Sequence, residues 1–273
     1  MTRKFDSYDD YKRHLKNKYG VGEGINYKPW LTIRDVKGKN AFRSIVKGIT
    51  TGRKHHFLSS IETQLFYILE FNKNTIDIRE QFPLFPLHTT KKIAQSLGVN
   101  HPQVPTSEID HVMTTDILLT CKKKNNVMKK AFCVKPLELL ADKRTLQKIE
   151  IERVWWQENN VDFFIFTGNK QTEILSRNIS WATDPIRSNT QHNLNSLLEP
   201  ATLQLSTGKY LKADICDEFM GIFNISKEEA LNLLRSLIGS KLIKVDMGVL
   251  LEDSISLNIN YVESIDRAAS NAY

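Results

Sequence analysis

Three side chains suited to phosphodiester chemistry stand near the ends of one predicted hairpin. Asp116 begins the apolar segment 115–121, and Cys133 and Lys135 end the apolar segment 127–135. Both segments are rich in strand formers, and the charged, asparagine-containing residues between them are typical of a turn. Equal steps outward from that turn pair Asp116 with Cys133. The open end of the hairpin therefore gathers a carboxylate, a thiol and an ammonium group.

Strand geometry predicts the face of the hairpin on which each of these side chains lies. Because side chains alternate along a strand, Cys133 and Lys135 are predicted to point the same way, whereas Phe132 and Val134 point into the core. A carboxylate such as Asp116 can hold Mg²⁺, which prefers oxygen ligands. A bound metal polarises a phosphate and lowers the pKa of a bound water. A lysine can offset the charge that builds on the phosphorus oxygens.

Two further oxygen donors are candidates for the same site. The backbone carbonyl of Val134 lies between Cys133 and Lys135, and Glu62 sits in the first turn of a helix predicted over residues 60–71. Ser59 and Glu62 also match a capping box, so Glu62 has a structural interpretation as well as a catalytic one. An aspartate and a lysine about twenty residues apart are common by chance. A surface lysine is the alternative interpretation of Lys135.

Charge is distributed unevenly along the chain. The net charge is +7. Residues 1–55 hold 14 Lys and Arg against 5 Asp and Glu, and residues 122–148 hold nine against two. Basic clusters attract phosphate backbones, although solvated lysines are common on any surface. The candidate DNA contacts are Arg53, Lys54, His55, Lys143 and Arg144.

Length and composition limit the possible classes of protein. The chain has 273 residues, of which 41% are hydrophobic, enough for one large domain or two ordinary ones. It contains no apolar run long enough to span a membrane, and its first residues lack the apolar core of a secretory signal. The three cysteines form no CxxC pair, which argues against a structural zinc site or a disulfide framework. We therefore expect a cytoplasmic protein.

The order of predicted elements indicates an α/β first domain. A strand, a helix and a second strand in succession form a βαβ unit, so the last strand should run parallel to strand 127–135. We expect a mixed sheet of four or five strands with helices on its faces. The predicted elements are helix 7–19 with Ser7 as cap, edge strand 76–86, helix 91–97, helix 139–159 and buried strand 161–167.

The charge and the predicted elements of the chain change after Gly168. Residues 168–273 hold 10 Lys and Arg against 13 Asp and Glu. A helix opened by a Ser226–Glu229 capping box runs to about Gly239, and short strands at 242–246 and 254–257 follow. Helices followed by a two-stranded wing suggest a winged-helix-like module. Because it lacks the positive charge of a DNA reader, we favour protein binding for this module.

Several motifs together resemble the TnsA family, the endonuclease subunits of heteromeric cut-and-paste transposases. The resemblance covers roughly residues 20–170. The C-terminal third resembles the family more in its pattern of residues than in their identities. The motifs are Tyr27–Leu31, Thr51–Glu62, Asp77–Leu84, Thr114–Asp116, Val134–Pro136 and Leu146–Trp156.

The resemblance implies a domain organisation and an activity. Residues 1–168 would form a restriction-endonuclease-like catalytic domain and residues 169–273 a winged-helix-like interaction domain. The enzyme would cut the 5′ ends of a transposon, acting on transposon-end double-stranded DNA. Its partner TnsB would cut the 3′ ends and join them to the target. The C-terminal domain would dock on the AAA+ regulator TnsC.

The resemblance also implies a catalytic set made of Glu62, Asp116 and Lys135. The metal would be Mg²⁺, with Mn²⁺ as a possible substitute, held by Glu62, Asp116 and the Val134 carbonyl. The family often has Gln or Glu where this chain has Cys133, and a thiol is a poor Mg²⁺ ligand, so Cys133 is a doubtful member. Two alternatives remain: a stand-alone restriction or repair nuclease of the same fold, and a non-catalytic binding module with a degenerate site.

Overall fold

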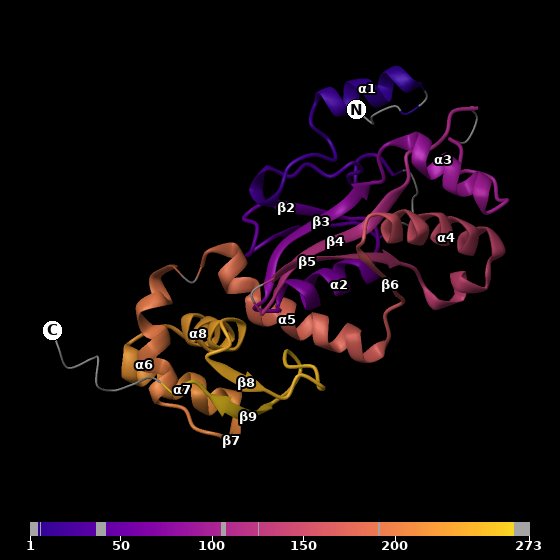
Figure 1. Cartoon of the computed structure of the whole chain (residues 1–273). Coiled ribbons are helices and arrows are strands. Elements are labelled where there is room, and N and C mark those ends of the chain that lie inside the picture. Colours follow the sequence, from indigo (N-terminus) through magenta and orange to yellow (C-terminus); the bar gives the residue numbers. More distant parts are fainter. Residues whose placement is uncertain are drawn as a thin grey trace. The chain divides into compact units, whose positions relative to one another are not determined.

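The chain folds into two compact units. This computed structural model describes residues 5, 7–36, 42–104, 108–124, 126–190 and 192–264 (Figure 1). The units are Met1–Asn169 and Lys170–Tyr273. Within the described residues, every cluster of buried hydrophobic side chains lies in a single unit. Each unit therefore has a core of its own, and the division falls one residue beyond the boundary expected from the sequence.

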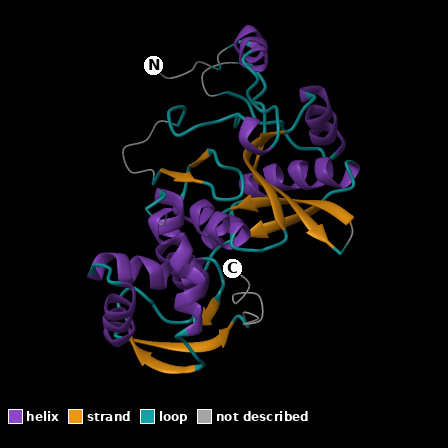
Figure 2. Cartoon of the chain, turned by 90° about the vertical axis from the view of Figure 1, so that its left-hand side faces the viewer, coloured by secondary structure: helices purple, strands orange, loops and turns teal. Residues whose placement is uncertain are grey.

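A four-stranded mixed sheet forms the centre of the first unit. Its strands, drawn in orange in Figure 2 and labelled in Figure 1, have the order β3-β4-β5-β6. β3 pairs with β4 and β4 with β5 in antiparallel fashion, whereas β5 and β6 run parallel. The structure thus confirms the α/β class, the mixed directions and the parallel last strand, in keeping with a restriction-endonuclease-like fold. The strands are β3 (Thr75–Pro83), β4 (Thr114–Lys123), β5 (Asn126–Val134) and β6 (Asp162–Phe166).

The predicted hairpin is present in the predicted register. β4 and β5 pair from Ile117 opposite Phe132 to Lys123 opposite Asn126. One further step outward brings Asp116 opposite Cys133, as the sequence indicated. Lys124 adopts a left-handed conformation in the turn, with φ 56°. Asn125, the other predicted turn residue, lies outside the described residues.

Helices cover both faces of this sheet. On one face, Ile117, Leu119 and Val134 pack with side chains of α2 (Ser60–Glu70). On the other face, Leu118 and Ala131 pack with side chains of α3 (Leu87–Ser96) and α4 (Lys143–Glu158). Consecutive residues of one strand therefore enter different cores, because strand side chains alternate.

Three predictions about single elements need correction. The helix predicted from Leu139 begins at Lys143, because Asp142 caps it by accepting from the Thr145 backbone N–H at 2.6 Å, and a 3₁₀ turn (Leu137–Ala141) precedes it. The helix expected from Lys91 begins four residues earlier, at Leu87, the first residue of α3. β6 was expected to be buried, but it is an edge strand, and Phe164 and Ile165 are 41% and 43% exposed.

The N-terminal part of the first unit holds a helix and a strand pair. Ser7 caps α1 (Tyr8–Lys16), as predicted, by accepting from the Asp10 backbone N–H at 3.1 Å. A short 3₁₀ helix (Gly24–Asn26) follows. β1 (Ser44–Lys47) and β2 (Lys54–Phe57) then form an antiparallel pair directly before α2. The basic segment at residues 53–56 therefore belongs largely to a strand.

The second unit places its helices around a three-stranded sheet. The Ser226–Glu229 capping box predicted for α8 is present in full. The sheet order is β7-β9-β8, and β7 is a strand that the sequence analysis did not predict. The winged-helix assignment itself stays a prediction. The elements are α5 (Lys170–Ser188), a 3₁₀ helix (His192–Leu197), α6 (Leu198–Leu203), β7 (Gly208–Leu211), α7 (Lys212–Phe223), α8 (Lys227–Gly239), β8 (Ile243–Val245) and β9 (Ser256–Val262).

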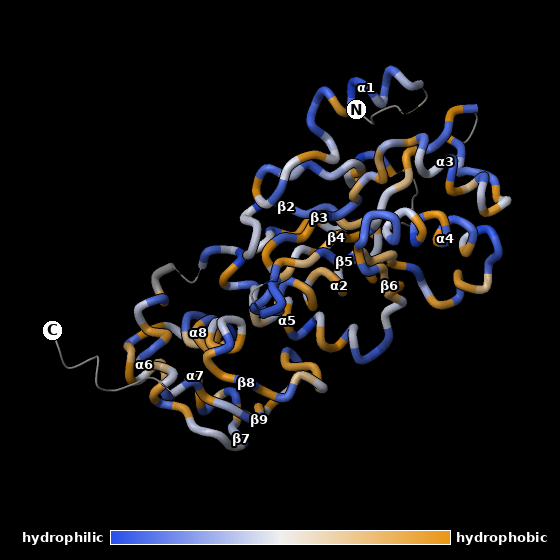
Figure 3. Tube along the Cα trace, viewed as in Figure 1, coloured by the Kyte–Doolittle hydropathy of each residue, from blue (hydrophilic) through white to orange (hydrophobic). Residues whose placement is uncertain are grey.

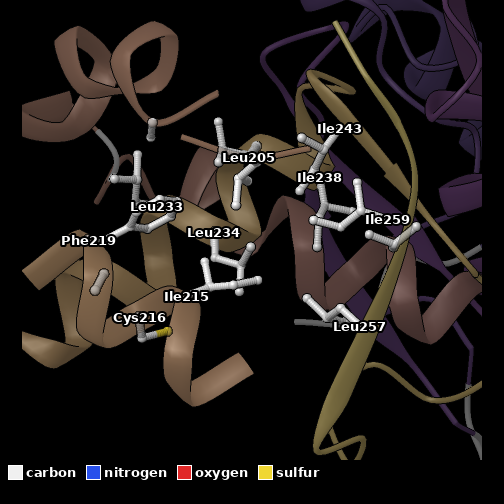
Figure 4. Close-up of a cluster of buried hydrophobic side chains, with 14 of the residues drawn as sticks. Leu205, Ile215, Cys216, Phe219, Leu233, Leu234, Ile238, Ile243, Leu257 and Ile259 are labelled. Carbon is white, nitrogen blue, oxygen red and sulfur yellow. The ribbon is translucent and has the colours of Figure 1, made fainter. Parts of the chain in front are cut away.

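Hydropathy follows this architecture. Hydrophobic residues concentrate on the central strands of the first unit and on α8, whereas α1 is largely hydrophilic (Figure 3). In the second unit, Leu233 and Leu234 of α8 belong to the same buried cluster as Phe219 of α7 and Ile259 of β9 (Figure 4). Among the helices that the structure describes, none has the length and apolarity to cross a membrane.

Candidate active site

Asp116 stands at the centre of a network of polar contacts near the start of β4. Its Oδ2 accepts from the Val134 backbone N–H at 2.7 Å and from Lys135 Nζ at 2.9 Å. Lys135 Nζ also donates to the Val134 carbonyl at 2.8 Å. On the other side, Asp116 Oδ1 accepts from Gln81 Nε2 at 3.3 Å. The hairpin thus brings together the carboxylate, the ammonium and the backbone carbonyl that the sequence singled out.

Lys135 is held in its charged form. Burial, the largest single influence, would lower the pKa of the ammonium, but the charge of Asp116, the hydrogen bond to it and the other acidic groups nearby together outweigh burial and raise the pKa above its ordinary value. Lys135 therefore keeps its proton at neutral pH. In this arrangement it acts as a fixed positive charge beside the carboxylate.

Glu62 lies in the first turn of α2, whose N-cap is Ser59, and its carboxyl group is affected by the charge of Asp116. Ser59 Oγ accepts from the Glu62 backbone N–H at 3.1 Å, and Glu62 Oε2 accepts from the Leu58 backbone N–H at 3.0 Å. Burial, and secondly the negative charge of Asp116, raise the pKa of Glu62 to about 7. The two interpretations offered by the sequence are therefore compatible. Glu62 takes part in the hydrogen bonds at the start of α2, and its carboxyl group is close enough to Asp116 for the negative charge there to raise its pKa.

Cys133 lies deeper than the sequence indicated. It is 1% exposed and interacts with Glu152 of α4. Burial and the nearby carboxylate raise the pKa of the thiol, so it stays protonated. Its face of the sheet is covered by α4 rather than open. A buried neutral thiol is a poor ligand for Mg²⁺, which weakens the case for Cys133 in a metal site.

Glu152 is a site residue that the sequence analysis missed. Burial, and then the charge of Asp116, raise its pKa to about 8. Within the part of the chain that the structure describes, its Oε1 is buried without a hydrogen-bond partner. A signal was present in the sequence, because Glu152 interrupts the apolar side of a helix between Ile149 and Trp156.

These groups border one pocket of about 450 Å³. Asp116 and Lys135 lie on its sheet side, and Glu152 and Lys148 on its α4 side. Glu62 does not line this pocket. The pocket therefore joins two carboxyl groups to two lysines, an arrangement with the charges needed to receive a phosphate group beside acidic residues.

Two of the predicted DNA contacts are internal. Arg53 and His55 are both buried. Arg53 makes a bidentate pair with Glu80, at 2.8 and 2.6 Å, and His55 Nδ1 lies 2.9 Å from a Glu80 oxygen. The expectation that Arg53 and His55 contact DNA is therefore corrected. Their side chains stabilise the contact between β2 and β3 instead.

The other three predicted DNA contacts lie at the surface. Lys54 and Lys143 are exposed, and Arg144 is half-buried. Arg144 donates to the Asn100 carbonyl at 2.7 Å, so it also fastens the loop after α3. Lys143 and Arg144 open α4 in its first turn, where acidic residues are usual because of the helix dipole. Basic residues at that position favour contact with an anion.

Comparison with known proteins agrees with the motifs. The family described as TnsA-like endonuclease N terminal matches residues 72–168, which run from the start of β3 to the end of the first unit. The chain is 34% identical, over 236 residues, to the Escherichia coli protein named Transposon Tn7 transposition protein TnsA. This similarity spans 86% of this chain and 85% of that protein.

Proposed function

Since the chain belongs to the TnsA family of transposition endonucleases, we propose that it cuts the 5′ ends of a transposon in a Mg²⁺-dependent reaction. The observation that carries this proposal is the contact of Lys135 with both Asp116 and the Val134 carbonyl. These groups lie at the end of a β-hairpin and beside a buried glutamate. The reaction is hydrolysis of a phosphodiester bond in transposon-end double-stranded DNA.

The donor set fits a hard cation in part. Among the described residues, no three His, Cys, Asp or Glu side chains are arranged to hold a metal. Glu62 and Asp116 nonetheless offer two carboxylates, and the Val134 carbonyl offers a third oxygen. The raised pKa of Glu62 reflects burial and repulsion by Asp116, and a cation would relieve that repulsion. We therefore assign these three groups to Mg²⁺, with Mn²⁺ as a substitute.

The metal, when bound, polarises the scissile phosphate and makes a bound water more acidic. The residues of the chain supply the remaining requirements. Asp116 is oriented by the Val134 N–H, so its carboxylate presents a fixed direction to the site. Lys135 stabilises the negative charge that develops on the phosphate oxygens. Because Lys135 is protonated, it serves as a charge and a hydrogen-bond donor rather than as a base.

The same pocket suggests where the DNA backbone lies. Lys148 lines the pocket, and Lys143 and Arg144 stand one turn away at the start of α4. Together with the positive end of the helix dipole, these cations suit phosphates next to the scissile bond. Lys54 is a further surface contact in the proposal. Arg53 and His55 are left out because they are buried.

Partners complete the proposed reaction. We assign cutting and joining of the 3′ ends to TnsB, and docking on TnsC to the second unit. The second unit is mildly acidic, and its α8 opens with Glu228 and Glu229, which disfavours DNA as its ligand. Its charge instead supports binding to a protein surface.

A strand-specific cleavage assay tests this proposal. DNA carrying the element's own ends is incubated with the chain, with or without TnsB, in Mg²⁺, Mn²⁺ or EDTA. We expect 5′-strand cuts that need the metal and TnsB. Metal-dependent cutting without TnsB would favour a stand-alone restriction or repair nuclease. If TnsB cuts its strand and the 5′ strand stays intact, the chain is a binding module with a degenerate site.

A further inference from the structure

Gln81 has a backbone conformation that is unusual for its residue type. It lies inside β3 with φ 48°, in the left-handed region, although it is neither glycine nor asparagine. It is also 3% exposed. Residues held in this region inside a fold cluster at functional sites, where the surrounding structure maintains the strain.

The strained residue marks the point at which β3 changes face. Ile78 belongs to the core of α2, and Glu80 pairs with Arg53 of the loop before β2. Phe82 should share their face by alternation, yet it packs with the core of α4. Gln81 is the residue between the two orientations. Its conformation therefore redirects the end of β3.

β4 changes face at the paired position. Ile117 packs in the core of α2. Thr115, two residues earlier, accepts a hydrogen bond from Trp156 of α4 at 2.6 Å, so it faces the opposite side. Asp116 lies between them, and the neighbouring pairs Glu80–Ile117 and Phe82–Thr115 of β3 and β4 place it beside Gln81. The side chains of β3 and β4 therefore change face at the same pair of residues, Gln81 and Asp116.

The Gln81 side chain connects this turn to the carboxylate. Its Nε2 donates to Asp116 Oδ1 at 3.3 Å, and its Oε1 accepts from Thr114 Oγ1 at 3.0 Å. The Gln81 carbonyl accepts from the buried Trp30 N–H at 3.2 Å. The amide is thus held at both ends, while Lys135 and Val134 contact the other carboxylate oxygen.

We propose that Gln81 is a positioning residue for cleavage, whose amide fixes the plane of the Asp116 carboxylate against the Val134 and Lys135 contacts. The inference rests on the proposed role of Asp116. Partners of this kind, placed behind a metal ligand, typically change activity or metal affinity by about 10- to 100-fold when removed. Gln81 touches neither the phosphate nor the metal in this account.

Two substitutions at Gln81 distinguish the effect of losing its side-chain amide from the effect of its strained backbone conformation. Gln81→Gly and Gln81→Ala both remove the amide, but only glycine adopts the left-handed conformation without strain. We expect the alanine variant to melt at a lower temperature than the glycine variant in EDTA. We expect both to cut the 5′ strand about 10- to 100-fold more slowly, in the complete reaction with TnsB. Gln95→Ala, on the exposed side of α3, is the matched control and should cut at the native rate.

A second readout does not depend on cleavage. Bound Mg²⁺ raises the melting temperature of a protein that binds it only when folded. We expect the Mg²⁺-induced rise to require more Mg²⁺ in both Gln81 variants than in the native chain. Gln81→Gly cutting at the native rate, or rates that simply follow the melting temperatures in EDTA, would overturn the inference. The Asp116→Ala variant is measured alongside to test the proposed function itself. If Asp116→Ala cuts the 5′ strand, the proposed catalytic site is wrong, whatever the Gln81 variants show.

Discussion

At the scale of single residues, Asp116 balances opposite charges. Lys135 and the Val134 N–H share its Oδ2, while the charge of Asp116 disfavours ionisation of the nearby carboxyl groups of Glu62 and Glu152. Both glutamates have raised pKa values, first because they are buried and then because Asp116 repels their charged forms. The same charge on Asp116 helps to raise the pKa of the Lys135 ammonium, so this lysine stays protonated beside the carboxylate. The electrostatic state of the site therefore depends on Lys135.

Removal of that charge is the first residue-scale prediction. Lys135→Ala should reduce 5′-strand cleavage by about 100- to 1000-fold, as expected when one donor to a developing negative charge is lost. DNA binding and partner binding should remain close to native. Cleavage in single turnover, binding by fluorescence anisotropy and melting temperature would be measured together. A parallel loss of folding and cleavage would contradict this role.

A second residue-scale prediction concerns acid stability. Burial opposes ionisation of Glu80, but His55 and Arg53 outweigh it and lower its pKa to about 2. A group with a lowered folded pKa adds stability above its unfolded pKa, near 4.5, and loses it as the pH falls towards 2. The contribution is on the order of 3 kcal/mol.

Glu80→Gln tests that contribution. The variant should be less stable than the native chain at pH 7, because Arg53 loses its buried partner. Its free energy of unfolding should also vary less between pH 5 and pH 2. Urea unfolding at a series of pH values measures both effects. Equal pH dependence in the two proteins would show that Glu80 does not account for acid sensitivity.

At the scale of elements, the first turn of α4 combines two roles. Asp142 caps the helix, and Lys143 and Arg144 follow it against the usual preference for acids. Lys143 is exposed and free to meet solvent or a ligand, whereas Arg144 also holds the Asn100 carbonyl. α4 thus presents Glu152 and Lys148 to the pocket and carries two further cations in the turn before them.

Salt dependence of DNA binding tests the role of this turn. Lys143→Ala should weaken binding of end DNA similarly for different sequences and lower the slope of log affinity against log salt by about 1. Lys227→Ala is the matched control, since Lys227 is also an exposed first residue of a helix, in the second unit. An unchanged slope in Lys143→Ala, or an equal change in Lys227→Ala, would exclude a phosphate contact at Lys143.

Elements with strong local signals were predictable. The hairpin register followed from two apolar segments and a polar turn, and the caps at Ser7, Ser59 and Ser226 followed from short motifs. β1, β2 and β7, each four residues long, were missed. The edge position of β6 was also missed, because an apolar strand looks the same in sequence whether or not a neighbour covers it.

The site was predictable only in part for a related reason. The contact of Asp116 with Lys135 depends on local pairing within one hairpin, which the sequence specifies. Arg53 and His55 resembled surface cations because their partner Glu80 lies 25 or more residues away. Glu152 and Gln81 reach Asp116 only through packing of α4 and a strained turn of β3. Those contacts depend on the tertiary fold, and the sequence around each residue gives little indication of them.

At the scale of the whole molecule, the chain consists of two units with separate cores. The core of the second unit runs from Ala182 to Ile259, and the cores of the first unit end at Phe166. Domains with cores of their own generally fold independently. The proposed division of labour places cutting in the first unit and regulator binding in the second.

Truncation tests that division. Residues 1–169 alone should unfold cooperatively and retain the Asp116 site, while stimulation by TnsC should be lost. Circular dichroism during thermal unfolding, and cleavage with TnsB in the presence and absence of TnsC, measure the two properties. A fragment that TnsC still binds and stimulates would place the docking surface in the first unit.

The most direct test of the central claim is 5′-strand cleavage by Asp116→Ala beside the native chain. The reaction contains DNA with the element's own ends, TnsB and Mg²⁺, and Asp162→Ala, an exposed aspartate of β6, serves as the control. We predict 5′ cuts by the native chain and by the control, and none by Asp116→Ala, while TnsB cuts its strand in every reaction. Native-rate 5′ cleavage by Asp116→Ala would contradict the account.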